Sequence, residues 1–532
     1  MLKASGAMAA ATLLSRLLGM VREMVYGYFM GTTWVASAFM LAFQIPNLFR
    51  RLLGEGALTA AFIPIFKEKE KRRGEADMWR AANAVISGLV ILTCVVVALA
   101  LVGVTVALAL GGPDAHGASF FTAKTVLMLQ LLRVMLPYLV LVCLAAVFMG
   151  ILNARGHFFI PAMGATMLNV VMVASVLLLA PHLGLAYPAG ERLPHQIFAL
   201  AIGVLAAGVA QAAFQLPTLH RDGFRFQWVS PRGDDTVQRV VRQMLPATLG
   251  VAAFQINVVL TQGLSYWVDD YVVASFQYAV RLMELPQGLF GISLATYLLP
   301  TLSGLAVEKK FDAFRTELRQ GVGYLIFTNL IASVLLVALA EPIIRLLFER
   351  GKFDATSTSE ATLALMCLAP GLVAFSLVNI LARAFFALGD IRTPMKTSVI
   401  CLTLNLALAL ALVWRFKQGG LGLANTLTSL VNMTLLTWLL RRKLNGLDLR
   451  SLRRPVLTLL ALAVAAGGLA YGGWFWWERT LGHASLALKI GAVFVPAGVA
   501  GGFYWVGALL CHVPAAREMT EFALVKFKRR IN

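Results

Sequence analysis

The stretch VISGLVILTCVVVALALVGVTVALAL, from Val85 to Leu110, carries no charged side chain. An α-helix needs about 20 consecutive apolar residues to cross the hydrocarbon core of a bilayer. Thr458–Trp477 is a second apolar run of this length. Both runs are too continuous for the alternating strands of an outer-membrane barrel. The sequence therefore predicts an all-α, polytopic membrane protein.

The composition agrees with this prediction. Of the 532 residues, 59% are hydrophobic and 14% are charged, whereas soluble domains carry roughly a quarter of charged residues. The net charge of +20 would suggest a nucleic-acid partner in a soluble protein. Cytoplasmic loops of membrane proteins are also rich in Lys and Arg, however. No nucleic-acid partner is therefore expected.

About fourteen spans can be placed along the chain, in pairs joined by short loops. Their approximate limits are 6–30, 34–66, 80–110, 124–152, 158–181, 195–218, 238–267, 271–303, 316–340, 359–388, 392–415, 419–440, 455–477 and 486–511.

The loops between these spans alternate in charge. Basic side chains follow the second, sixth, eighth and twelfth spans: Lys67, Lys69, Lys71, Arg72, Arg73, Arg221, Arg225, Arg232, Lys309, Lys310, Arg315, Arg441, Arg442, Lys443, Arg450, Arg453 and Arg454. The loop after the seventh span instead carries Asp269 and Asp270. Because basic loops face the cytoplasm, both termini are predicted to be cytoplasmic. The loop after the ninth span is an exception, because it is expected outside and still carries the basic residues Arg345, Arg350 and Lys352. We therefore predict that it forms a short external re-entrant or amphipathic segment.

The chain also contains an internal repeat. Pro137–Pro161 and Pro370–Pro394 each run from proline to proline, and Gly156 and Gly389 fall at the same offset within them. The shift spans six helices, which predicts two six-helix lobes related by a pseudo-twofold axis along the membrane normal. The predicted parts are an N-lobe (1–220), a C-lobe (236–445), two C-terminal helices (453–511) and a basic cytoplasmic tail (512–532).

One apolar segment contains buried charge. The segment AFQIPNLFRRLLGEGALTAAFIPIF, Ala42–Phe66, holds Arg50, Arg51 and Glu55 in its middle. Arg50 precedes Phe66 by 16 residues, which is about 24 Å along a helix. Arg50 is therefore predicted to lie deep in the membrane.

Other spans carry charge as well. Arg16, Arg22 and Glu23 lie in the first span, and Arg281 and Glu284 in the eighth. An arginine facing lipid at the centre of a span costs roughly 2.5–3.5 kcal/mol. The arginines are therefore expected to face a hydrated cavity between the lobes, or to form interhelical salt bridges with the glutamates. A cationic cavity favours an anionic substrate, because the planar guanidinium binds phosphate with two hydrogen bonds.

No sequence motif for enzymatic chemistry is present. The chain has no GxxxxGK[ST], GxSxG or HExxH pattern, which are signatures of nucleotide binding, acyl transfer and zinc-dependent hydrolysis. Its histidines and cysteines show no ligand or pairing pattern. We therefore expect no enzyme activity, no metal and no cofactor.

The seventh, eleventh and twelfth spans contain no carboxylate, although cation-coupled carriers usually place one within a span. Their polar residues are expected to form interhelical hydrogen bonds rather than an ion site: Asn257, Thr261, Asn405, Asn425 and Thr428.

Four motifs resemble a known family: SRLLGMVRE (Ser15–Glu23), IPNLFRRLLGEGALTAAFIPIF (Ile45–Phe66), RLMELPQGLFGISLATYLLPTLS (Arg281–Ser303) and GDIRTP (Gly389–Pro394). The sequence is similar to the MurJ (MviN) lipid II flippases of the multidrug/oligosaccharidyl-lipid/polysaccharide exporter superfamily. The resemblance covers essentially the whole chain. It implies fourteen helices, two lobes and a monomeric carrier in the bacterial inner membrane, with a groove for a polyprenyl tail beside the last two helices.

The resemblance also implies the substrate and its ligands. Lipid II, the undecaprenyl-pyrophosphate-linked disaccharide pentapeptide, would be flipped outward by alternating access, with membrane lipids and cell-wall synthesis proteins as further partners. The family's cavity arginines correspond to Arg16, Arg22, Arg50 and Arg281. We add a set of supporting residues beside them: Ser15, Glu23, Gln44, Asn47, Arg51, Glu55 and Glu284.

Four positions depart from the family pattern. Many members have Asp at the positions of Ser37 and Val280, Lys at that of Asn379, and an acidic residue at that of Thr261. These departures leave the arginines in place and favour the membrane potential over sodium or proton coupling. Two other functions stay open: export of another polyprenyl-pyrophosphate-linked oligosaccharide, and a non-transporting scaffold for cell-wall enzymes. A drug exporter is disfavoured, because cationic drugs require an acidic cavity.

Overall fold

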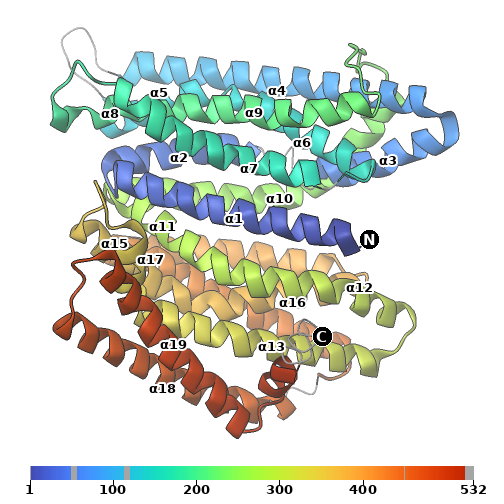
Figure 1. Ribbon diagram of the computed structural model, residues 1–532. Helices are drawn as coiled ribbons and strands as arrows, with labels where there is room; N and C mark the ends of the chain where they lie inside the picture. The colour runs from blue at the N-terminus through green and yellow to red at the C-terminus, as the bar shows by residue number, and fades with distance from the viewer. Residues whose placement is uncertain (1, 50–56, 113–119, 158, 448–449, 522–532) are drawn as a thin grey trace. The chain divides into compact units, whose positions relative to one another are not determined.

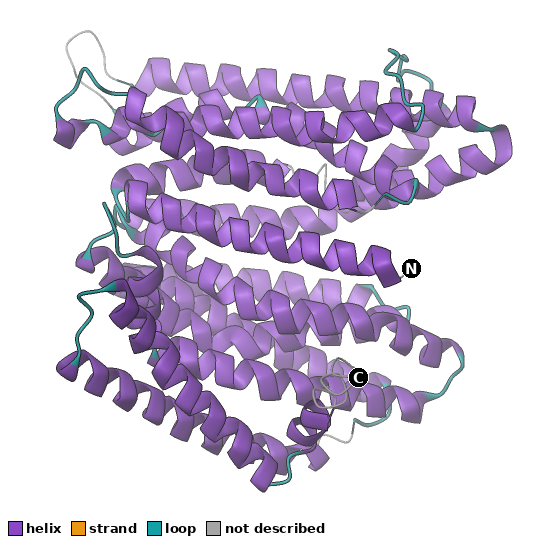
Figure 2. Ribbon diagram, in the orientation of Figure 1, coloured by secondary structure: helices purple, strands orange, loops and turns teal. Residues whose placement is uncertain are grey.

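The computed structural model describes residues 2–49, 57–112, 120–157, 159–447 and 450–521. These residues form helices and loops, and no strand occurs among them (Figure 2). The helices separate into two compact units, Met1–Ala274 and Ser275–Asn532.

Unit one contains the first ten α-helices and three short helical turns. Their bounds are α1 (Leu2–Met30), α2 (Trp34–Phe49), α3 (Ala57–Arg73), α4 (Glu75–Gly111), α5 (Ala123–Met135), α6 (Tyr138–Ala154), α7 (Phe159–Ala174), η2 (Ser175–Leu179), η3 (Ala180–His182), η4 (Ala189–Glu191), α8 (Leu193–Gln196), α9 (Phe198–Arg221) and α10 (Asp235–Val268).

Unit two contains the other helices, and α18 and α19 pack side by side at the C-terminal end of the chain (Figure 1). The bounds are α11 (Val272–Pro286, which begins in unit one), η5 (Gln287–Ile292), α12 (Ser293–Val307), α13 (Phe311–Ala338), α14 (Ala340–Phe348), α15 (Ala355–Leu368), η6 (Ala369–Gly371), α16 (Leu372–Ala387), α17 (Arg392–Lys443), α18 (Arg450–Thr480) and α19 (Leu486–Leu510).

Each predicted span falls on a helix or on consecutive helices. Eight of the described helices are long and apolar enough to cross a membrane, or nine if α5 and α6, bent by 45°, form one span. The predicted eleventh and twelfth spans both lie in α17, whose 52 residues are broken at Lys417 (φ 49°, ψ −126°). The second span corresponds to α2 and α3, and residues 50–56 between them lie outside the described part. The count of fourteen stays a prediction.

The internal repeat is visible in the backbone of both units. Pro137 separates α5 from α6, and Pro370 lies in η6 between α15 and α16. Proline has no amide hydrogen and ends a helical hydrogen-bond pattern in this way. Gly156 and Gly389 then follow α6 and α16 with φ of +89° and +73°, the left-handed conformation that favours glycine after a helix. The second proline of each stretch lies in the first turn of α7 or α17.

The GDIRTP motif forms the start of α17. Asp390 accepts hydrogen bonds from the backbone amide and the hydroxyl of Thr393, at 3.0 and 2.8 Å, and pairs with Lys443 at 2.5 Å. These contacts, that with Lys443 first, lower the pKa of the Asp390 carboxyl to about 2. The motif thus satisfies a backbone amide in the first turn of α17 and ties this end of the helix to the other.

The predicted lobe boundary at residues 221–235 precedes the boundary between the compact units by one helix. The reason is α10, which packs against α2, α3 and α4 within unit one. The six-helix division of the internal repeat therefore stays a prediction about the lobes.

The short segment predicted after the ninth span is the helix α14. Its Arg345 side chain is 15% exposed and contacts Glu341 at 2.5 Å, Glu349 at 3.5 Å and Glu478 of α18 at 3.0 Å. Three carboxylates therefore neutralise this arginine, and one of them joins α14 to α18.

The topology predicts which sites are accessible from each side of the membrane. Lys71, Arg442 and Asp270 are exposed. In a variant with serine at the native cysteines, we expect Lys71→Cys and Arg442→Cys to react with a membrane-impermeant thiol reagent only from the cytoplasm. Asp270→Cys should react only from outside. Labelling of all three from one side would overturn the topology.

Candidate functional site

Helix α1 carries Ser15, Arg16, Arg22 and Glu23 and packs against α7. The side-chain amide of Asn169 in α7 donates a hydrogen bond to the carbonyl of Ser15, at 3.2 Å. Asn169 is buried, so this bond anchors the middle of α1 to its neighbour.

Arg22 is the best defined of the predicted substrate ligands. Arg22 is 8% exposed and Glu23 is 5% exposed, and an Arg22 Nη2 to Glu23 Oε1 contact of 2.5 Å joins them. The ring of Tyr26 lies 5.4 Å from the guanidinium carbon. The Nε of Arg22 is buried and has no hydrogen-bond partner among the described residues. Because a buried unsatisfied donor is costly, an acceptor that reached this N–H would relieve that cost.

A row of aromatic rings fixes the position of Tyr26 beside Arg22. Tyr26 contacts Phe39 of α2 edge-on at 5.9 Å, and Phe39 stacks on Phe43 at 6.1 Å. Phe43 in turn lies 6.3 Å from Tyr138 of α6. Such ring pairs add to the energy of apolar burial, so α1, α2 and α6 are held together around the buried ion pair.

The other predicted residues of unit one are less enclosed. Arg16 is partly buried and forms no ion pair with any residue in the described part of the chain. Gln44 and Asn47, three residues apart on one face of α2, are also partly buried. Arg50, Arg51 and Glu55 lie outside the described residues.

In unit two, Arg281 of α11 pairs with Glu284 at 2.8 Å, and both side chains are substantially exposed. The salt-bridge alternative predicted interhelical pairs, and it is right only in that Arg22 and Arg281 each pair with a glutamate. In each case the acidic partner lies in the same helix, whereas that alternative assumed partners on neighbouring helices.

A polar cluster at one end of unit one was missed from the sequence. The Lys124 side chain of α5, 11% exposed, donates to the carbonyls of Tyr266 and Asp269, at 2.7 and 3.2 Å, and lies 3.2 Å from the carboxylate of Asp270. Ser37 of α2 donates to the carbonyl of Asp270. Ser37, a departure from the family pattern, therefore helps to join α2 to the end of α10. The lysine before an apolar span was the only sequence signal.

The polar residues of the membrane spans do not all behave as expected. Asn425 donates to the carbonyl of Leu421 in its own helix, at 2.9 Å, so the prediction of an interhelical bond was wrong there. The hydroxyls of Thr261 and Thr428 are buried with no partner among the described residues. Within that part of the chain, no group of three or more His, Cys, Asp or Glu residues could hold a metal ion.

Sequence comparison places the chain in a family. A family model described as Lipid II flippase MurJ matches residues 26–490. The chain belongs to the lipid II flippase MurJ family. A probable lipid II flippase MurJ from Vibrio cholerae is 31% identical over 490 residues, covering 90% of each chain. A lipid II flippase MurJ from Burkholderia cenocepacia is 32% identical over 442 residues, covering 81% of this chain and 82% of the relative.

Two solved transporter structures share the fold of this chain. A lipid II flippase MurJ in an inward closed conformation matches with a TM-score of 0.75 at 20% identity, covering 94% of this chain and 99% of that chain. An inward-facing multidrug resistance MATE family transporter of the MOP superfamily matches with a TM-score of 0.66 at 14% identity, covering 83% and 98%. The prediction of an all-α polytopic transporter fold is confirmed.

Proposed function

We propose that this protein flips lipid II from the cytoplasmic to the outer leaflet of the bacterial inner membrane by alternating access. Membership of the MurJ family and a transporter fold support the reaction. The observation that carries the proposed binding chemistry is Arg22, a buried guanidinium whose Nε–H has no hydrogen-bond partner in the described part of the chain. Because the family consists of flippases rather than enzymes, we propose no bond-breaking reaction for this protein.

The pyrophosphate of lipid II suits this guanidinium. Glu23 occupies an Nη of Arg22 and neutralises its charge while no substrate is bound. A phosphate oxygen can accept the Nε–H without displacing Glu23, and charge-assisted hydrogen bonds of this kind are stronger than neutral ones. The Tyr26 ring limits the space on one side of the guanidinium, which orients the remaining N–H groups.

We extend the proposal to Arg16, Arg50 and Arg281 as further phosphate ligands. Arg16 has no ion-pair partner in the described part of the chain, so its charge is available. Arg281 is exposed enough to leave Glu284 for a substrate. Gln44 and Asn47 supply neutral donors and acceptors for the sugars or peptide. The protein would act as a monomer with both termini in the cytoplasm.

Depletion of the protein tests the function directly. We expect lipid II to accumulate in the cytoplasmic leaflet, where an external enzyme that cleaves lipid II cannot reach it, and re-expression should restore cleavage. If lipid II stays accessible from outside while a different polyprenyl-linked oligosaccharide accumulates inside, the protein exports that oligosaccharide. If both stay accessible and only cell-wall enzymes are mislocalised, the scaffold alternative is correct.

A further inference from the structure

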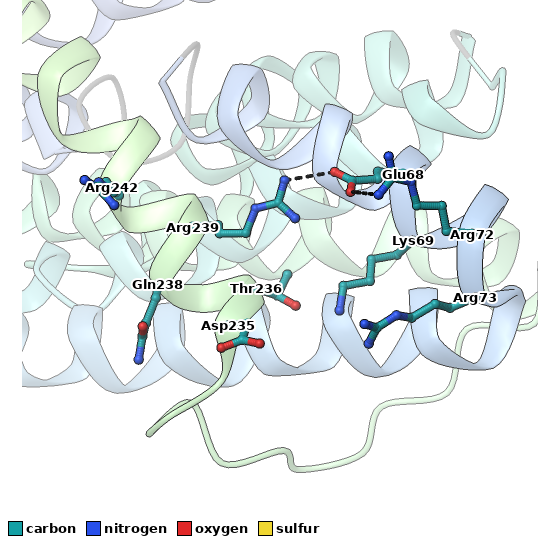
Figure 3. Close-up of a pocket in the computed structure, with 9 residues that line it drawn as sticks. All are labelled: Glu68, Lys69, Arg72, Arg73, Asp235, Thr236, Gln238, Arg239 and Arg242. Carbon is teal, nitrogen blue, oxygen red and sulfur yellow. Dashed lines mark hydrogen bonds and ion pairs between the residues drawn. The ribbon is translucent and has the colours of Figure 1, made fainter.

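A polar cavity of about 410 Å³ lies between the end of α3 and the start of α10, both in unit one. We call it the basic pocket, and its lining residues are Glu68, Lys69, Arg72, Arg73, Asp235, Thr236, Gln238, Arg239 and Arg242 (Figure 3). Five of these residues are cationic and two are carboxylates. The pocket therefore has a formal excess of three positive charges.

Helical spacing brings the cations to facing sides of the two helices. Lys69 and Arg73 are four residues apart and share one face of α3, while Arg239 and Arg242 are three apart on α10. Figure 3 shows Lys69 and Arg73 extending from α3 toward α10. Two segments distant in the sequence thus direct positive charge into one space.

The carboxylates balance only part of this charge. Glu68 accepts a hydrogen bond from Arg239 at 2.9 Å and lies 3.4 Å from Arg72. Lys69 and Arg242 form no ion pair with any residue of the described ranges. An anion in the pocket would therefore meet two cations, Lys69 and Arg242, that form no ion pair within the described ranges.

The segment before α10 runs along α4. The Asn83 side chain of α4 donates to the carbonyl of Arg225, at 3.0 Å, and accepts from the amide of Gln227, at 3.3 Å. The Val229 amide donates to the Ser87 hydroxyl at 3.4 Å. These bonds to alternate residues hold Arg225–Val229 against α4.

The residues between those bonds mark the membrane interface. Phe226 and Trp228 are 54% and 60% exposed, and exposed aromatic rings concentrate where lipid headgroups meet the hydrocarbon core. The exposed apolar face of α4 begins at Ile91, about one turn beyond Ser87, and continues at helical spacing to Leu110. The segment therefore lies at the headgroup level, and it leads directly into α10 at Asp235.

We propose that the basic pocket binds the phosphate headgroup of an anionic phospholipid in the cytoplasmic leaflet. Basic pockets between membrane helices on this side recognise such headgroups, and arginine binds phosphate with paired hydrogen bonds. The cytoplasmic side follows from the basic loops. The bound phospholipid is a resident of the membrane and is distinct from the transported lipid, so this site does not depend on the proposed transport function.

The ordinary explanation for these cations is that cytoplasmic loops are basic in general. On that explanation, every exposed cation of the region contributes equally to phospholipid binding. On the proposal, the cations that line the pocket contribute most. Lys71, on α3, and Arg221, at the end of α9, are exposed and do not line the pocket. They offer a matched control with the same change in net charge.

Native mass spectrometry of the purified full-length protein tests the proposal, with phosphatidylglycerol and phosphatidylcholine of identical acyl chains as probes. We expect preferential binding of phosphatidylglycerol by the unmodified protein and by the Lys71→Gln/Arg221→Gln control. The Lys69→Gln/Arg242→Gln variant should lose about fivefold in affinity for each cation removed. Equal losses in variant and control, or no loss in the variant, would refute the site. Full displacement of the lipid by equimolar inorganic phosphate would show a soluble-anion site instead.

A second measurement covers the case in which the double variant fails to fold. The unmodified protein is placed in phosphatidylglycerol vesicles that contain lipids brominated near the headgroup or near the end of the acyl chain. The difference in fluorescence between the unmodified protein and Trp228→Phe reports on Trp228 alone. We expect stronger quenching by headgroup-proximal bromine. The absence of quenching at either depth would show that Trp228 lies outside the membrane, and it would overturn the placement of the pocket.

Discussion

Removing the buried ion pair of α1 is expected to abolish transport while the protein still accumulates in the membrane. Arg22→Ala alone would leave Glu23 as an uncompensated buried charge, which costs about 3–5 kcal/mol of stability. The informative variant is therefore Arg22→Ala/Glu23→Ala, which removes both charges. Truncating a buried, hydrogen-bonded charge costs about 2–5 kcal/mol of binding. We expect at least a thirtyfold loss of lipid II flipping, which is the lower end of that range at about 1.4 kcal/mol per factor of ten.

The controls separate charge from geometry. Arg22→Lys keeps the charge but loses the planar fork of donors, so it should restore transport only partly. Arg80→Ala removes an exposed arginine of α4 and should leave transport unchanged. Alanine at Arg16, Arg50 or Arg281 should act in the same direction as the double variant. Accessibility of lipid II to external cleavage and immunoblotting of membranes give the two readouts. Normal cell-wall synthesis supported only by the double variant would exclude Arg22 as a ligand.

The sequence predicted the helices well because their signals are local. An apolar run such as Val85–Leu110 is sufficient to predict a spanning helix, and α4 contains it without a break. Pro137, Pro370, Gly156 and Gly389 marked helix ends in both units, because each restricts or permits particular backbone angles. These properties belong to single residues and do not depend on the partners that a helix finds.

The contacts of the site were less predictable because they depend on packing. Adjacent residues such as Arg22 and Glu23 do not face each other along an ideal helix, so their spacing gave no reason to pair them. Only burial of both side chains against neighbouring helices makes the pair favourable. The basic pocket joins α3 to α10, which are far apart in sequence, and Lys124 meets Asp270 across a similar separation. No local sequence pattern indicates which distant residues will come into contact in the fold.

The second large effect concerns the energy source. We expect flipping to continue without sodium and to slow sharply when the membrane potential is removed. The α17 helix contains no carboxylate, and the seventh span, residues 238–267, contains none either. An inside-negative potential favours outward movement of the pyrophosphate by about 2.3 kcal/mol per charge per 100 mV, or about fiftyfold in an equilibrium. The empty carrier, in which Arg16 has no ion-pair partner among the described residues, is drawn back inward by the same field.

Proteoliposomes that contain the purified protein and lipid II allow the effect of the membrane potential to be separated from the effects of the proton and sodium gradients. Valinomycin with equal potassium on both sides removes the potential, nigericin removes the proton gradient, and replacement of sodium by potassium removes the sodium gradient. The first treatment should slow flipping far more than the other two. If sodium removal alone stops flipping, the hydroxyls of Thr261 and Thr428, which have no hydrogen-bond partner among the described residues, become candidate ion ligands. A hard cation prefers oxygen ligands. Ion binding would then explain why these two hydroxyls are buried in spans that contain no carboxylate.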